Sequence, residues 1–68
     1  MRSHLEPTLS IYRSHDRELL FHGDEAAGKA RGIKIKADLS SLTLDGKRLV
    51  IVNRDLRTDG SAALWVVA

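Results

Sequence analysis

Residues 23–30 have the spacing of a phosphate-binding loop, in which a glycine-rich turn ends in Gly-Lys and opens a helix. Three features oppose that interpretation. Ala30 stands where the motif has the Ser or Thr whose hydroxyl binds magnesium, and Asp24 and Glu25 would place two negative charges beside a triphosphate. A chain of 68 residues is also too short for the parallel sheet of such enzymes. We therefore interpret the string as a capped helix that contains a glycine.

Ser14, His15 and Asp16 have the residue types of a hydrolytic triad, but they are consecutive. Side chains of neighbouring residues diverge, whereas the nucleophile, base and carboxylate of a triad converge within hydrogen-bond distance. His15 and His22 flank an expected strand and lie about 20 Å apart at ~3.3 Å per residue, so we expect no shared metal ion. These residues predict a polar turn, and the chain is expected to be neither an enzyme nor a cofactor-binding protein.

Lysine and arginine are unevenly distributed. Residues 1–28 contain three Arg against five Asp or Glu, whereas residues 29–68 contain eight Lys or Arg against four Asp. If the cations of the second part share one face, they can contact the phosphates of a nucleic acid. The alternative is a solvated strand surface, where lysines also protect sheet edges. The candidate partner-binding residues, called the basic surface below, are Lys29, Arg31, Lys34, Lys36, Lys47 and Arg48.

The chain has only three aromatic residues. Tyr12 is expected to be the only one exposed on a sheet face, which gives little support to base stacking. Trp65 lies in the apolar run 64–67 and is expected in the core of a strand buried on both faces, with an interface anchor as the alternative. Tyr12 and Trp65 are therefore the candidate interface residues.

The clearest structural signal is Asp45-Gly46 between two apolar runs, which predicts a β-hairpin with a type I′ turn. A two-residue turn places Leu42 opposite Leu49, whereas a three-residue turn with a bulge is the competing register. The first register puts Leu42, Leu44, Leu49 and Ile51 on one face and is preferred. Val50 and Val52 then point the other way, so a second layer is expected from the helix, the first hairpin or another subunit.

The other elements are predicted from the alternation of apolar and polar residues and from the cap and turn residues between the alternating runs. Residues 8–13 and 18–22 predict a first hairpin, Asp24 and Gly32 bound a helix of about two turns, and residues 33–37 predict a strand with lysines outward. Residues 61–68 predict a last strand, which at a sheet edge would suit dimerisation. The expected fold is a single α+β, mostly β domain over residues 1–68 with a flexible tail at 1–7. It is a small antiparallel sheet or partly open barrel of five to six strands with one short helix, in the order ββαββββ.

The length and composition of the chain restrict the classes of function that we expect. The chain has no cysteine and no apolar run near the ~20 residues of a membrane span, so a cytoplasmic protein without membrane association is expected. A domain this small buries only about 60% of its unfolded surface, which favours oligomerisation or a partner. The leading hypothesis is a binding protein for an anionic macromolecule, either nucleic acid or nucleoprotein or an acidic protein surface. The alternative is a protein-directed inhibitor or assembly subunit, of the kind that viruses and mobile elements encode.

Overall fold

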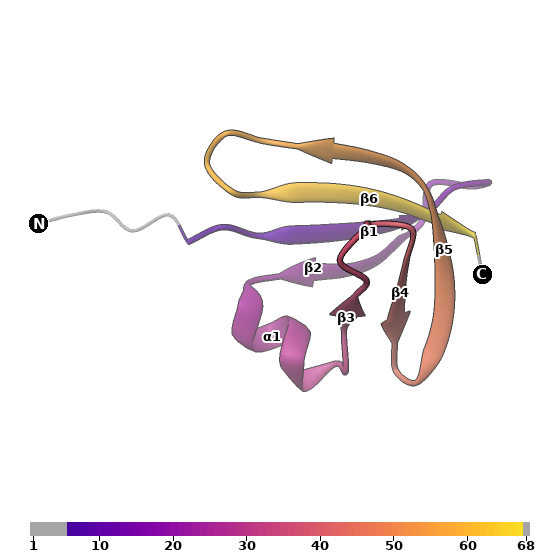
Figure 1. The fold of residues 1–68 in the computed structure, drawn as a ribbon, viewed down its shortest axis with the longest axis horizontal. Coiled ribbons are helices and arrows are strands. Elements are labelled where there is room, and N and C mark those ends of the chain that lie inside the picture. The colour runs from indigo at the N-terminus through magenta and orange to yellow at the C-terminus, as the bar shows by residue number, and fades with distance from the viewer. Residues whose placement is uncertain (1–5, 68) are drawn as a thin grey trace, which may run out of the picture.

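A computed structural model describes residues 6–67, which form one sheet and one short helix (Figure 1). The strands are β1 (Leu9–Arg13), β2 (Leu19–Gly23), β3 (Lys34–Ile35), β4 (Ser41–Leu44), β5 (Lys47–Leu56) and β6 (Ala62–Val67), and helix α1 (Glu25–Ala30) follows β2. The sheet curls into a half-barrel with the strand order β2-β1-β6-β5-β4-β3. The predicted mostly-β class and the order ββαββββ are confirmed.

Asp45 and Gly46 form the two-residue turn between β4 and β5. Their φ angles are 54° and 82°, and a type I′ turn requires positive values at both positions. Leu42 pairs with Leu49, so the preferred register is confirmed and the bulged alternative is wrong. β5 then continues without a break to Leu56, which makes it the longest strand, with 10 residues.

β6 lies in the middle of the sheet between β1 and β5, not at an edge. The edges are β2 and β3, so the expected dimer seam along an exposed last strand is wrong. β6 runs parallel to β1, whereas the other strand pairs are antiparallel. Along β6, Leu64 and Val66 are buried and Val67 is exposed, so the strand is not covered on both faces.

The core lies on the inner, concave face of the half-barrel. It is built from alternate residues of five strands: Ile11, Phe21, Leu42, Leu44, Leu49, Ile51, Leu64 and Val66. The predicted leucine face of the β4–β5 hairpin is therefore confirmed. Val50 and Val52, however, are 48% and 55% exposed, and no described residue forms the expected second layer over them.

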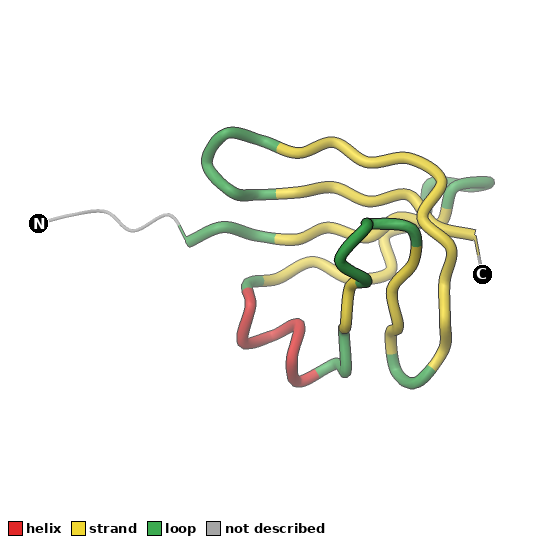
Figure 2. Tube along the Cα trace, in the orientation of Figure 1, coloured by secondary structure: helices red, strands yellow, loops and turns green. Residues whose placement is uncertain are grey.

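Helix α1 packs at one end of the sheet, near the two edge strands (Figure 2). Asp24 caps it by accepting a hydrogen bond from the N–H of Ala27 at 2.9 Å. Gly32 follows the helix with a φ of 69°, the left-handed conformation that favours glycine. Ala27 packs against the core and Gly28 is buried, so this helix touches the sheet through its smallest residues. No helix within residues 6–67 is long and apolar enough to cross a membrane.

The start of the described chain is tied to the turn between β5 and β6. The N–H of Thr8 donates to the hydroxyl of Ser61 at 3.1 Å, and the N–H of Ala62 donates to the carbonyl of Thr8 at 3.0 Å. Pro7 lies beside Gly60, which belongs to that turn. The predicted tail therefore falls mostly on residues 1–5, which are outside the described part of the chain.

Candidate nucleic-acid interface

Strand register places three members of the basic surface on the outer, convex face of the sheet. Lys34 pairs with Thr43, and Thr43 pairs with Arg48, so these residues form a row across β3, β4 and β5. Neighbouring strands are about 4.8 Å apart, which separates the backbones of Lys34 and Arg48 by about 10 Å. Lys36 lies two residues beyond Lys34, and its N–H extends the pairing by donating to the carbonyl of Ser41 at 2.9 Å. None of the three cations forms an ion pair with another described residue.

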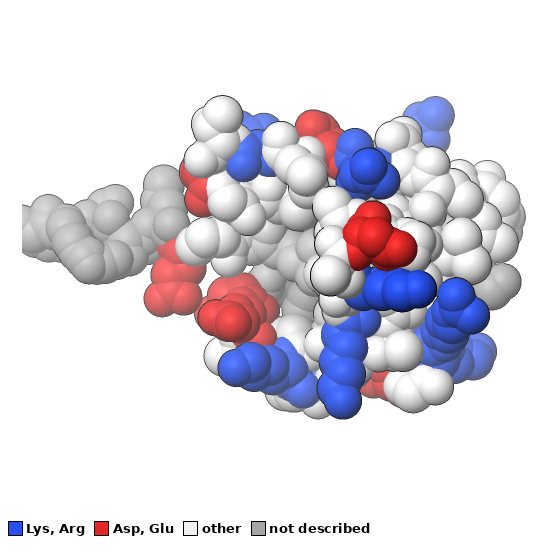
Figure 3. Space-filling model, viewed as in Figure 1, with Lys and Arg blue, Asp and Glu red and all other residues white. Residues whose placement is uncertain are grey.

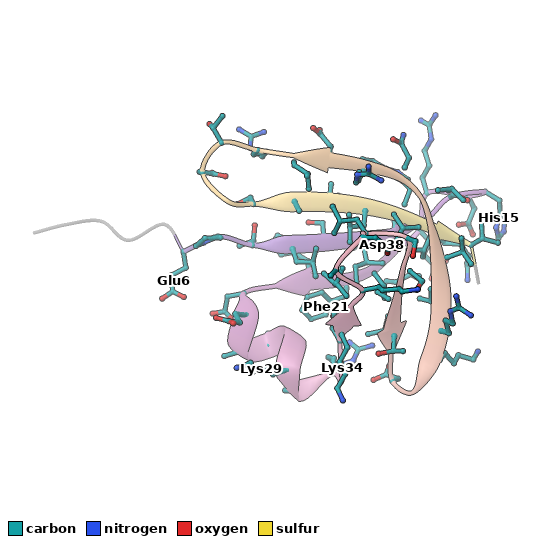
Figure 4. The ribbon with its side chains drawn as sticks, in the orientation of Figure 1. Glu6, His15, Phe21, Lys29, Lys34 and Asp38 are labelled. Atoms are coloured by element: carbon teal, nitrogen blue, oxygen red, sulfur yellow. The ribbon has the colours of Figure 1, made fainter. Side chains whose placement is uncertain are left out.

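Lys29 lies on the helix, Arg31 directly follows it, and Lys47 lies at the hairpin tip; the contact between Arg31 and Asp45 places them at the same end of the molecule. Figure 3 shows Lys and Arg side chains gathering over α1, β3 and the β4–β5 hairpin. In Figure 4, Lys34 projects from the lower border of the molecule and Lys29 lies on α1 at the lower left, whereas Phe21 is inside the molecule. Lys47 pairs with Leu44, a core residue, so its position belongs to the inner face rather than the outer one. The six cations thus share one end of the fold, but only half of them share one sheet face.

Arg31 differs from the others because it joins the helix to the hairpin. Its guanidinium donates to both carboxylate oxygens of Asp45, at 3.2 and 2.8 Å, and its Cζ lies 6.0 Å from the centre of the Phe21 ring. The N–H of Asp45 also donates to the carbonyl of Arg31 at 3.0 Å. The side-chain hydrogen bonds, with the attraction between the two charges, hold the pKa of Asp45 below its ordinary value and raise the pKa of Arg31. Arg31 therefore stabilises the fold, and its charge is largely compensated.

Asp38 adds a negative charge close to Lys36. The hydroxyl of Ser40 donates to its carboxylate at 2.6 Å, and the N–H of Ser40 donates at 3.0 Å. These two hydrogen bonds, with a smaller contribution from the charge of Lys36, lower the pKa of Asp38. Asp38 is therefore ionised near neutral pH and partly offsets the charge of Lys36.

Tyr12 and Trp65 form an aromatic pair at the centre of the outer face. They are direct partners on the parallel strands β1 and β6, and their rings stack with centroids 5.3 Å apart and planes 19° apart. Both side chains are half-buried. The expectation that Trp65 belongs to the core is therefore wrong, as is the expectation that Tyr12 is the only aromatic residue on an exposed sheet face. The two candidate interface residues lie together.

A hollow of about 470 Å³ adjoins the aromatic pair, and Trp65 forms part of its wall. Its other lining residues are Ser14, Arg17, Val52 and Asn53. A register shift between Ile51 and Asn53 leaves Val52 as an extra residue in β5, and Asn53 consequently pairs with Trp65 on the outer face. Without that bulge, Asn53 would point to the inner face. Sequence reasoning missed Arg17 and Asn53, because the bulge has no local sequence signature here.

A second hollow, of about 360 Å³, opens on the inner side between α1 and the β5–β6 turn. Its lining is mostly apolar and includes Leu9, Ile33 and Ile35. Lys29 borders it together with Asp24 and Glu25, so the charges at its rim oppose one another. This hollow is therefore a poorer match to an anionic ligand than the outer face.

The remaining sequence candidates have structural roles. Asp16 accepts hydrogen bonds from Arg13, the shortest at 2.7 Å, and this contact is the main cause of its lowered pKa. Nε2 of His15 lies 3.7 Å from the same carboxylate, which stabilises a turn rather than forming a triad with Ser14. Within residues 6–67, no three His, Cys, Asp or Glu side chains are grouped as metal ligands.

The phosphate-loop-like string is also accounted for by its local contacts. The Asp24 carboxylate, by capping α1, places a negative charge where a phosphate would otherwise bind, and Gly28 faces the core rather than a ligand. The outer face from β1 across β6, β5 and β4 to β3, with its unpaired cations and its aromatic pair, is thus the best candidate for a functional surface. No family model matches the chain, and no curated protein or solved structure shows significant similarity to it.

Proposed function

We propose that this protein is a non-enzymatic binding protein that engages nucleic acid through its basic surface. The observation that supports the proposal best is the row formed by Lys34 and Arg48, with Lys36 beside it, on an outer face free of ion pairs with other described residues. Cations that form no ion pair attract phosphates, and their binding releases the counterions that are condensed on the nucleic acid. Lys34 and Arg48 are held on strands, and Lys36 directly follows β3, where its N–H donates to the carbonyl of Ser41, so the spacing of the three residues is fixed by the sheet.

The proposal is tested by fluorescence anisotropy with labelled DNA and RNA oligonucleotides across a series of salt concentrations. Affinity is expected to fall steeply as salt rises, because each phosphate contact with a single strand contributes about 0.7 to the slope of log affinity against log salt. The double variant Lys34→Glu/Lys36→Glu is expected to bind more weakly and to lower that slope by about 1.4, from two lost contacts.

The matched control is Arg54→Glu/Arg57→Glu. It changes the net charge by the same amount, but Arg54 lies toward the far end of β5 and Arg57 follows that strand. This variant is expected to bind nearly as well as the unchanged protein. Equal losses in both variants, or no binding to any oligonucleotide at low salt, would contradict the proposal.

A second candidate function, a protein-directed inhibitor or assembly subunit, is favoured by the apolar side chains on the same outer face. Val50 pairs directly with Val67, and both are about half exposed. Exposed apolar patches of this kind mark protein interfaces in other proteins. Sedimentation velocity over a range of concentrations tests the self-assembly form of this candidate, and a monomer at every concentration would contradict that form.

A further inference from the structure

The residues that line the hollow beside Trp65 offer chemistry suited to a nucleobase. Trp65 supplies an aromatic surface, Asn53 an amide, Ser14 a hydroxyl and Arg17 a guanidinium. An aromatic side chain stacks on any base, an amide can bond to a base edge, and a guanidinium can contact a phosphate. Arg17 forms no ion pair with a described residue, whereas its neighbour Arg13 binds both Asp16 and Glu18. The volume of about 470 Å³ is within the range of small-ligand sites.

The aromatic pair is not needed to fill the core. Ile11, Leu64 and Val66, three of the four residues that flank Tyr12 and Trp65 along β1 and β6, are fully buried on the inner face. The two rings instead support each other on the outer face, and the stacked Tyr12 limits the motion of Trp65. A restrained indole beside a hollow loses little conformational entropy when a base stacks on it.

The hollow and the cationic row lie on the same face and are joined by β5. Asn53 borders the hollow, and Arg48 lies five positions earlier on that strand, about 15 Å away along the backbone. Val50 and Val67 form the exposed floor between them. A flexible strand whose phosphates reach Lys34 and Arg48 can therefore extend one base toward Trp65. The bases of a duplex cannot do this, because they remain paired and stacked inside the helix.

We infer that the nucleic acid bound by this protein is single-stranded and that one base stacks on Trp65 in the hollow formed with Asn53 and Arg17. The inference rests on the proposed function, because it names the form of nucleic acid that the basic surface binds. It adds the stacking of a base on Trp65, a contact that charge alone does not provide and that can be measured separately from the phosphate contacts.

Trp65 is the single tryptophan of the chain, so its intrinsic fluorescence reports on this site alone. The experiment titrates the protein with an oligonucleotide of about ten nucleotides, a length within the site sizes of single-strand binders, as DNA and as RNA, alone and annealed to its complement. Single strands are expected to quench the fluorescence and duplexes to leave it nearly unchanged. Trp65→Phe is expected to retain most single-strand affinity, and Trp65→Leu to weaken it about tenfold, because stacking survives only in the first.

A second pair of variants leaves the indole and the core in place. Val52→Glu puts a negative charge into the hollow, whereas Leu56→Glu puts the same charge at a similarly exposed position of the same strand, outside the hollow. Val52→Glu is expected to abolish the quenching by single strands, and Leu56→Glu to preserve it.

The outcomes separate the inference from the proposed function. Salt-dependent binding that is equal for single strands and duplexes, with unchanged Trp65 fluorescence, would overturn the inference and leave the proposed function standing. No binding of any oligonucleotide would overturn both. Self-association that shields Trp65, seen as a concentration-dependent fluorescence change and a dimer in sedimentation, would overturn the inference because a second copy would then cover the hollow.

Discussion

Replacement of Gly28 by alanine is expected to stabilise the protein. Gly28 is buried in the middle of α1, and its backbone is helical. A Cβ atom added there would lie 3.8 Å from Cδ1 of Ile33 and 3.9 Å from Cζ of Phe21, which are ordinary van der Waals distances. The added methyl group therefore fills available space beside the core without displacing a neighbour.

Two effects set the size of the expected change in the free energy of unfolding for Gly28→Ala. Alanine is favoured over glycine in a helix interior by about 1 kcal/mol, mainly because glycine loses more backbone freedom on folding. Burying one methyl group contributes up to about 0.8 kcal/mol more. Because the helix has only six residues, the two contributions are not realised in full, and we expect a net gain of about 1 kcal/mol in the free energy of unfolding. In a domain of this size, that gain raises Tm by about 4–8 °C.

Urea denaturation and thermal melting followed by circular dichroism measure the change. The matched control is Gly23→Ala, the same substitution at the end of β2, where a Cβ atom would lie 2.8 Å from Cβ of Ala27 and 3.0 Å from Cζ of Phe21. This crowding forces the helix away from the sheet and is expected to cost about 1–3 kcal/mol. A loss of stability in Gly28→Ala, or equal effects in the two variants, would refute the packing described here.

Two further predictions concern the β4–β5 turn. Gly46→Ala is expected to cost about 1–2 kcal/mol in urea denaturation, because the φ angle of 82° is unfavourable for alanine although no atom lies within 4 Å of the added methyl; an unchanged midpoint would contradict the type I′ turn. Arg31→Gln is expected to be less stable than the unchanged protein above pH 3.8 and to lose that difference as the pH falls further. The reason is that the pKa of Asp45 is lowered in the folded state from 3.8, so the stability from this ion pair is present above that value and disappears as the carboxylate is protonated. Melting curves from about pH 6 to about pH 2 check the sign, and a difference that grows in acid would contradict it.

The candidate site was only partly predictable. The alternation of residues 33–37 predicts that Lys34 and Lys36 share one strand face, and the register across β3 to β5 places Lys34 on the outer face together with Arg48. Arg31 could not be recognised as a structural residue, because its partner Asp45 lies in a turn that is distant in the sequence. A charge count treats paired and unpaired cations alike, and only the tertiary contacts separate them.

What the sequence determined by itself is local. The positive φ angles required at Asp45 and Gly46, the capping of α1 by Asp24 and the inward alternation of the leucines depend on residues within a few positions of one another. The position of β6 depends on how the whole chain closes its core, because an apolar strand can pair equally well with several neighbours. Only the tertiary structure therefore decided that β6 lies beside β1, which brings Trp65 against Tyr12. The bulge at Val52 in β5 turns Asn53 toward the outer face that carries Trp65. This bulge was likewise decided by the pairing of β5 with β6 and not by any residue on its own.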